Sequence, residues 1–258
     1  MRIAVIGSGL MGRAVVYDLS RAEGVEKVGL FDFDSDLAEE IAKKYGNEIT
    51  EAGKIDAGNE DDVAAVLAEY DACVSAVTYK YNPGLTRASI TSKTHFFDLG
   101  GNNDVVKAQF EMNDAARLAD VIIIPDCGLA PGMVSILAAD GVTEFDKVKS
   151  LKIRVGGLPQ NPRPPLNYQM VFSSEGLINE YWEPVVILEN GQKKIVNPMT
   201  GVETLEFDGI GELEAFYTSG GTSTLPDSYR ETIDFLDYKT IRYPGHCQLF
   251  RPHALPGD

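Results

Sequence analysis

The sequence predicts an α/β fold: a doubly wound Rossmann domain with a parallel sheet, followed by an α+β domain on a mostly antiparallel sheet. Three observations support this prediction. The chain opens with a short apolar run that ends in a glycine-rich turn, MRIAVIGSGLMG. Short apolar runs then alternate with helix-like segments, which is typical of parallel strands joined by helical crossovers. Near residue 147 this rhythm gives way to alternating segments and turns, which indicate hairpins.

The opening segment predicts a strand, a tight turn and a helix that together bind a dinucleotide. Its three glycines have the spacing G-x-G-x-x-G. The first allows the turn, the second lets the backbone approach a pyrophosphate, and the third lets the helix pack on the strand. The helix N-terminus then offers free N–H groups to the phosphates. We expect the whole loop to bind the cofactor: Gly7, Ser8, Gly9, Leu10, Met11 and Gly12.

The second predicted strand ends at an acidic residue that bears on the choice of dinucleotide. Asp32 lies 20 residues after Gly12, where a carboxylate accepts hydrogen bonds from the adenosine ribose. In the segment FDFDSD no Arg or Lys follows it to receive a 2′-phosphate. The sequence therefore predicts NAD rather than NADP as cofactor. The alternative interpretation is a glycine-rich turn followed by a surface aspartate.

The later strands of the first domain place further candidates at the edge where such sheets bind ligands. Strands are predicted at 2–7, 27–32, 50–55, 72–77, 94–98 and 120–125, and helices at 35–45, 60–70, 84–92 and 104–118. We expect Asp56 and Ala57 near the adenine, although Asp56 could instead cap a helix or lie in a loop. Beside the central phosphates and ribose we expect Ser75, Ala76, Val77 and Thr78.

Composition disfavours several classes of protein. The net charge of −16 argues against nucleic acid or an anionic membrane as partner. No apolar run is long enough to cross a bilayer, and no charged leader precedes the first strand, so we expect a cytoplasmic protein. Its 3 cysteines form no C-x-x-C pair, and we expect no disulfide framework and no metal site.

The second domain is expected to begin at residue 142, after a first domain of residues 1–141. Val186 and Leu188 precede the turn Glu189-Asn190-Gly191, and QKKIV follows, which together predict a hairpin. The proline-rich segment 158–167 is expected to form a rigid loop within this domain.

Five segments in this order resemble the saccharopine dehydrogenase-like oxidoreductases, and within them the lysine 6-dehydrogenase branch. The segments are GSGLMG at 7–12, SAVTYKYN at 75–82, THFFDLGGN at 94–102, DCGLAPGM at 126–133 and TIRYPGHC at 240–247. The resemblance runs to about residue 250 and implies a Rossmann domain and a second domain whose sheet covers the active-site cleft. Members of the family continue well past TIRYPGHC, so the tail FRPHALPGD suggests a truncated C-terminus and an incomplete second domain.

The resemblance also implies the chemistry. The lysine branch oxidises the ε-carbon of L-lysine with NAD and releases ammonia, whereas sister branches act on saccharopine or carboxynorspermidine. All transfer a hydride between a nicotinamide and a carbon that bears nitrogen. An amino-acid substrate is therefore expected. A homo-oligomer, most simply a dimer, is expected because a sheet face or edge left uncovered after TIRYPGHC would associate with a partner. A non-catalytic NAD-binding remnant is the alternative.

Three candidates for the chemistry lie in the first domain, at strand ends. Asp98 would face the substrate amine, or else cap the next helix through backbone N–H groups. Tyr79 would bind substrate or carboxamide, or else pack between domains. Cys127 lies in a loop that the resemblance places beside the nicotinamide; the alternative is a small buried thiol, and no covalent nucleophile is needed.

Two further candidates belong to the motif TIRYPGHC in the second domain. Arg242 could hold the α-carboxylate of the substrate in a bidentate pair. His246 could act as an acid or base. The alternative interpretation is that the segment is a simple turn and His246 a hydrogen-bonded polar residue.

Overall fold

The computed structural model describes residues 1–251, and the chain divides into two compact units, Met1–Gly128 and Leu129–Asp258. The division lies earlier than the expected boundary at residues 141 and 142. The reason is helix α7 (Met133–Thr143), whose Val134 and Ala138 pack with Ile153 and Leu236 in the core of the second unit. Only the first two residues of the tail segment FRPHALPGD lie within the described residues.

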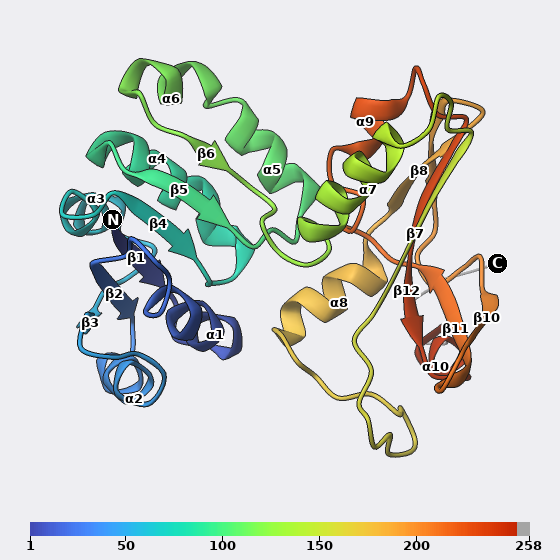
Figure 1. The fold of residues 1–258 in the computed structure, drawn as a ribbon, viewed down its shortest axis with the longest axis horizontal. Helices are drawn as coiled ribbons and strands as arrows, with labels where there is room; N and C mark the ends of the chain where they lie inside the picture. Colours follow the sequence, from blue (N-terminus) through green and yellow to red (C-terminus); the bar gives the residue numbers. More distant parts are fainter. Residues whose placement is uncertain (252–258) are drawn as a thin grey trace. The chain divides into compact units, whose positions relative to one another are not determined.

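The first unit is the predicted Rossmann-type domain, a parallel sheet of 6 strands in the order β3-β2-β1-β4-β5-β6 (Figure 1). Its strands are β1 (Arg2–Ile6), β2 (Lys27–Asp32), β3 (Thr50–Lys54), β4 (Ala72–Ser75), β5 (His95–Asp98) and β6 (Ile123–Ile124). Its helices are α1 (Leu10–Leu19), α2 (Ser35–Tyr45), α3 (Glu60–Leu67), α4 (Asn82–Ser92), α5 (Asn103–Phe110) and α6 (Asn113–Ala119), with a short 3₁₀ helix η1 (Tyr79–Tyr81).

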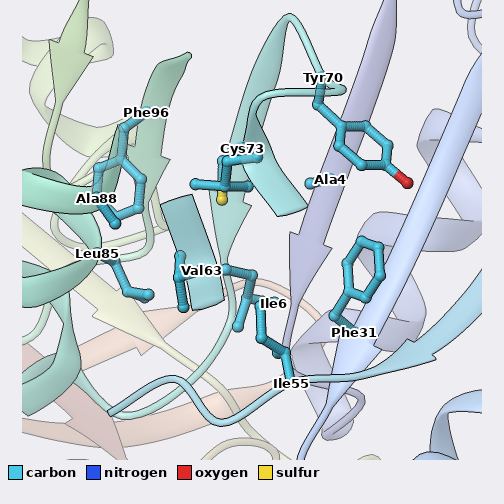
Figure 2. Packing of buried hydrophobic residues seen from close by; sticks show 11 residues of the cluster. Ala4, Ile6, Phe31, Ile55, Val63, Tyr70, Cys73, Leu85, Ala88 and Phe96 are labelled. Carbon is cyan, nitrogen blue, oxygen red and sulfur yellow. The ribbon is translucent and has the colours of Figure 1, made fainter. Parts of the chain in front are cut away.

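Helices cover both faces of this sheet, because its strand residues alternate between two cores. Val5 packs with Val16 of α1 and Ile41 of α2 on one face. On the other face, Ile6 and Phe96 pack against α3 and α4. Figure 2 shows this second core, in which side chains from β1, β2, β4 and β5 meet those of Val63, Leu85 and Ala88.

The segment expected to form one helix over 104–118 is divided into α5 and α6. Met112 separates the two helices with φ −89° and ψ 4°, outside the helical region, and its N–H bonds to Gln109 O. The sequence contains no Gly or Pro there to signal the break.

The second unit contains a mixed, mostly antiparallel sheet, as the sequence predicts. Its strands are β7 (Ser150–Gly156), β8 (Val185–Glu189), β9 (Gln192–Val196), β10 (Glu203–Phe207), β11 (Gly211–Tyr217) and β12 (Phe235–Arg242). The order is β10-β11-β12-β8-β9, and β7 runs parallel to β12. The expected hairpin of β8 and β9 is confirmed: Asn190 and Gly191 both have positive φ, as its tight turn requires.

The two faces of this second sheet differ in kind. One face packs on α7 and on α8 (Ser174–Trp182), α9 (Leu225–Tyr229) and α10 (His246–Phe250). The opposite face carries an ion network in which the guanidinium of Arg154 donates to both carboxylate oxygens of Asp237 and to Glu203. Alternation along β12 therefore sends Leu236, Tyr238 and Arg242 toward the helices.

Candidate functional site

The glycine loop of the first unit has the geometry that a dinucleotide needs. Gly7 has φ +108°, and a Cβ there would lie 2.8 Å from the backbone of Ala76. A Cβ on Gly12 would lie 1.8 Å from the carbonyl oxygen of Gly7. Around a Cβ on Gly9, however, nothing lies within 4 Å. Gly7 and Gly12 are thus required by the fold itself, whereas Gly9 keeps open space at the N-terminus of α1, where a pyrophosphate would fit.

Ser8 and Asp32 join this loop to the end of β2. Ser8 N donates to Asp32 Oδ2 at 2.6 Å, and Asp34 N donates to Asp32 Oδ1 at 3.0 Å. Ser8 is fully buried, and its Oγ has no hydrogen-bond partner among residues 1–251. Leu10 and Met11 are exposed at the start of α1. Asp32 therefore lies beside the glycine loop, at the position predicted for a ribose-binding carboxylate.

Lys54 was not predicted as a site residue. It is paired with Asp32 in the register of the neighbouring strands β2 and β3. Its ammonium lies 5.3 Å from the ring centroid of Phe33. The strand pairing could have been predicted from the sheet order, but Lys54 is far from Asp32 along the chain and outside any motif. A cation thus lies at the same sheet edge as the carboxylate.

The candidates after β3 and β4 have different surroundings. Asp56 lies in a loop, where its Oδ1 accepts from Gly58 N at 2.8 Å, while Asn59 caps α3; Ala57 adjoins it. Ser75 is buried, and its Oγ donates to Asn82 Oδ1 at 2.8 Å, so this hydroxyl supports the sheet edge. Ala76 and Val77 pack against Gly7. Thr78 precedes η1, and its Oγ1 is buried without a partner among the described residues.

Asp98 is buried, and its carboxylate is held by hydrogen bonds within the first unit. Its Oδ1 accepts from Gly100 N at 2.8 Å and Asp126 N at 3.2 Å, and its Oδ2 accepts from Gln109 Nε2 at 2.7 Å. Burial raises the pKa of this carboxyl, while the three N–H donors oppose the shift. The donors come from a loop, a neighbouring loop and a helix rather than from a helix cap. Asp98 therefore ties the loop after β5 to the loop after β6.

Tyr79 and Cys127 lie near the same strand ends. The ring of Tyr79 would be 3.5 Å from a Cβ on Gly101, in the loop after Asp98. Cys127 is exposed, and its N–H donates to the carbonyl of Asp98 at 2.7 Å. Partial burial and the negative charges of Asp98 and Asp126 raise the pKa of its thiol to about 11. Cys127 therefore stays a protonated thiol near neutral pH, which disfavours a nucleophilic role.

In the second unit, Arg242 and His246 lie in one buried cluster with Tyr181 of α8. Arg242 is 4% exposed and His246 is 2% exposed. Arg242 Nε donates to Tyr181 Oη at 3.0 Å, and Tyr181 Oη lies 3.0 Å from His246 Nε2. The ring of Tyr168 lies over the guanidinium, 4.7 Å from centroid to Cζ. The motif TIRYPGHC is thus more than a simple turn, although sequence reasoning missed both tyrosines.

Two carboxylates complete the surroundings of this cluster. Glu214 of β11 accepts from Gly245 N at 2.9 Å and Cys247 N at 2.6 Å, and so anchors the first turn of α10 beside His246. Burial raises the pKa of Glu180 to about 7, with Arg242 opposing the shift. Burial is also the main cause that lowers the pKa of His246, so its imidazole is neutral at neutral pH. A neutral His246 whose ring nitrogens both have partners is poorly suited to act as an acid.

Residues 1–251 contain neither a metal-binding cluster nor a helix able to span a membrane. No group of three or more His, Cys, Asp or Glu side chains there could hold a metal ion. Within the same residues, no helix combines the length and apolar character needed to cross a membrane.

Known proteins are similar to this chain over nearly its whole length. The model of the saccharopine dehydrogenase NADP binding domain matches residues 3–124, and that of the saccharopine dehydrogenase C-terminal domain matches residues 128–255. The mitochondrial alpha-aminoadipic semialdehyde synthase of Bos taurus is 27% identical over 262 residues, which cover 96% of this chain and 27% of that protein.

Two comparisons with Saccharomyces cerevisiae agree with this. Saccharopine dehydrogenase [NADP(+), L-glutamate-forming] is 24% identical over 193 residues, covering 70% of this chain and 42% of that protein. The solved apo structure of saccharopine dehydrogenase (L-Glu forming) has a TM-score of 0.78 at 21% identity, covering 95% of this chain and 56% of that one. The chain thus spans between about a quarter and about half of these relatives. Its first unit is a pyridine-nucleotide-binding domain, and the chain belongs to the saccharopine dehydrogenase family.

Proposed function

We propose that this chain is a pyridine-nucleotide-dependent dehydrogenase that acts on a carbon bearing nitrogen in an amino acid of the lysine type. The observation that carries the proposal is the glycine loop, in which Gly7 and Gly12 are packed tightly while Gly9 keeps open space at the start of α1. Family membership supports the reaction class, because the relatives are named for saccharopine or for aminoadipic semialdehyde.

Each unit has its own part in this proposal. The bound dinucleotide supplies a hydride acceptor. The residues of the first unit bind it: the N–H groups at the start of α1 meet the phosphates, and Asp32 meets the ribose. In the second unit, Arg242 binds the α-carboxylate of the substrate, because a guanidinium pairs with a carboxylate in a fixed, bidentate geometry. That pair would hold the amino acid in one orientation, which is a precondition for hydride transfer.

Two substrates are candidates, and each has an observation in its favour. L-lysine, oxidised at its ε-carbon, is favoured by the resemblance of the five sequence motifs to the lysine 6-dehydrogenase branch. Saccharopine is favoured by the names of the relatives. The buried Arg242 suits either molecule, because both carry an α-carboxylate.

For the cofactor we propose a preference for NAD over NADP, which Asp32 favours and Lys54 opposes. The carboxylate of Asp32, bound to Ser8 N, would repel a 2′-phosphate on the adjacent ribose. The ammonium of Lys54, across the strand pair, could attract the same phosphate. Asp32 is expected to dominate because it is tied to the glycine loop by a hydrogen bond of 2.6 Å.

One experiment tests the proposal. The purified chain is titrated with NADH and NADPH, and nucleotide reduction is then measured with L-lysine and with saccharopine in the presence of NAD or NADP. We expect tighter binding of NADH and turnover with one of the two amino acids. Equal or tighter binding of NADPH would contradict the NAD preference. Nucleotide binding with no turnover of either amino acid would contradict the proposed reaction and leave a binding protein.

A further inference from the structure

The buried guanidinium of Arg242 forms no ion pair among the described residues, although Glu180 lies near enough for the two charges to interact. Its residue exposure is 4%, yet none of the ion pairs within residues 1–251 includes it. Buried charges in proteins are normally paired or coordinated, because their desolvation is costly. Arg154, on the opposite face of the same sheet, follows the rule with two carboxylates. Arg242 therefore differs from an arginine that only supports the fold.

Neutral groups hold Arg242 in place instead, and the donor and the acceptor of each of their hydrogen bonds can be assigned. The carbonyl of Leu166 lies 3.0 Å from His246 Nδ1, and a carbonyl can only accept, so Nδ1 carries the proton. The neutral ring then has an acceptor at Nε2, 3.0 Å from Tyr181 Oη. Tyr181 donates to that nitrogen and accepts from Arg242 Nε at 3.0 Å. Each polar group in this chain of bonds has a defined role as donor or acceptor.

This arrangement decides which edge of the guanidinium can meet a ligand. An arginine has five N–H donors. Nε–H is used by Tyr181, and one N–H of Nη1 is used by Ile241 O at 2.9 Å. The side-on edge formed by Nε and Nη2 is therefore closed to a bidentate ligand, whereas Nη2 and the second N–H of Nη1 make no hydrogen bond among the described residues, which leaves the end-on edge. The ring of Tyr168 covers one face of the guanidinium and blocks the approach of a ligand from that side.

Tyr168 provides a second sign of a ligand at this place. Its Oη is buried and has no hydrogen-bond partner within residues 1–251. Tyr168 also lines an open cavity of about 650 Å³ together with Arg163, Gln169 and the proline-rich loop. The residue thus contacts both the cavity and the arginine, and it has a free hydroxyl to offer.

We propose that Tyr181 and His246 are positioning residues that hold Arg242 so that its Nη1–Nη2 edge receives a carboxylate end-on. The inference rests on the proposed function, in which Arg242 binds the α-carboxylate of the substrate. Tyr181 and His246 do not touch the ligand themselves. They act indirectly: the hydrogen bond on Nε prevents the guanidinium from rotating, so its Nη1–Nη2 edge keeps one orientation.

The tautomer of His246 is central to this role, so the charges around its ring matter. Arg242 faces the ring from β12 through Tyr181, and Glu214 reaches the same turn from β11. Glu180 and Tyr181 are adjacent on α8, and Tyr168 stacks edge-on against the imidazole from the loop before it. A proton on Nε2 would turn the acceptor of Tyr181 into a donor and break the chain of bonds.

The first test measures the hydrogen bond from Arg242 Nε to Tyr181 directly, and it needs no turnover. In isotope-labelled protein, the NMR signal of the Arg242 Nε–H, assigned by its loss in Arg242→Lys, should be protected from exchange with water. Tyr181→Phe should abolish that protection. Tyr238→Phe is the matched control. It also removes a buried tyrosine hydroxyl, on the same strand and sheet face as Arg242, but this hydroxyl bonds to Thr240 and not to Arg242. An unprotected signal in the wild type, or a protected one in Tyr181→Phe, would overturn the proposal.

The second test uses ligands and separates this inference from the proposed function. Binding of L-lysine is compared with binding of cadaverine, which lacks the carboxylate. Tyr181→Phe should weaken L-lysine binding by about 10-fold, since hydrogen bonds to charged groups contribute that order of affinity. Cadaverine and NADH should bind as in the wild type. His246→Gln, which keeps an acceptor for Tyr181, should recover most of the affinity that His246→Leu loses.

The outcomes have distinct meanings. If Arg242→Met leaves L-lysine binding unchanged, the arginine is not the carboxylate ligand, and that part of the proposed function fails. If Arg242→Met weakens binding but Tyr181→Phe does not, only the positioning role fails. If Tyr181→Phe weakens cadaverine as much as L-lysine, the effect is a general loss of structure and the positioning role is again overturned.

Discussion

Gly9→Val should abolish cofactor binding while leaving the fold intact, whereas Gly12→Val should destabilise the fold itself. Gly9 caps α1 with φ −67° and ψ −164°, a conformation open to any residue, and a Cβ there meets nothing within 4 Å. Gly12 lies one turn later in the same helix, where a Cβ would be 1.8 Å from the carbonyl oxygen of Gly7. The two substitutions are chemically identical and three residues apart.

The structure gives the size of each effect. For Gly9→Val the loss is that of a helix-capping residue alone, about 1 kcal/mol or less. For Gly12→Val the backbone of Gly7 or of α1 has to move by more than 1 Å, because a contact of 1.8 Å must lengthen to at least 3.0 Å. Such overpacking against backbone belongs with the most destabilising substitutions, at about 4 kcal/mol or more. In a domain of this size these values correspond to a fall in Tm of about 5 °C and of more than about 10 °C.

Thermal unfolding and NADH titration measure the two effects separately. Gly9→Val should unfold near the wild-type Tm and bind NADH at least about 100-fold more weakly, a loss of about 2.7 kcal/mol. Normal NADH binding by this variant would refute the assignment of the loop. A Tm as low as that of Gly12→Val would instead refute the open space around Gly9.

Three other substitutions test the remaining site residues. Asp32→Asn should narrow the ratio of NADH to NADPH affinity, measured by titration, and an unchanged ratio would mean that the carboxylate does not face the ribose. Asp98→Asn places an amide against three N–H donors and should cost about 1–3 kcal/mol of stability; lost turnover at an unchanged Tm would instead support a substrate-facing role. Glu180→Gln should stabilise the chain increasingly as the pH rises from 4.5 to about 7, by up to about 3 kcal/mol, because burial raises the pKa of Glu180 to about 7 from its ordinary 4.5. A raised carboxyl pKa means that the wild type loses stability as pH rises through that value, so a pH-independent difference in denaturation would contradict it.

The features of the first unit that could be predicted are those that the backbone itself requires. Gly7 needs positive φ and Gly12 needs the absence of a side chain, and both demands are visible in a spacing of a few residues. Strand ends and the break at Met112 were harder to predict from the sequence, since tertiary packing rather than any local residue ends those elements. The domain boundary was expected too late for the same reason: α7 has an ordinary helical sequence, and only its contacts assign it to the second unit.

The buried cluster of the second unit shows what sequence reasoning could not supply. Arg242 and His246 share one motif and could be identified together, but Tyr181 lies 61 residues before Arg242 and belongs to a different helix. Tyr168 directly follows the proline-rich segment 158–167, for which the local sequence predicts only a rigid loop. Hydrogen bonds over such separations depend on the sheet order, which hairpin signals alone do not determine. The motif therefore indicated Arg242 and His246 together, whereas no signal in the sequence indicated the two tyrosines that contact them.

Asp98 and Arg242 are both charged residues at strand ends, and they differ in how their charge is satisfied. Each lies at the end of a strand and on the same side as core residues of that strand, Asp98 with Phe96 and Arg242 with Tyr238. Alternation along the strand therefore draws both charges inside, where their polar atoms need partners. Three N–H donors from two loops and a helix surround the carboxylate of Asp98, so its oxygens have hydrogen-bond partners within its own unit. Arg242 has used two of its five N–H groups, on neutral acceptors, and forms no ion pair among residues 1–251. Of the two buried charges, only the arginine is left in need of a ligand, and a carboxylate is the group that would satisfy it.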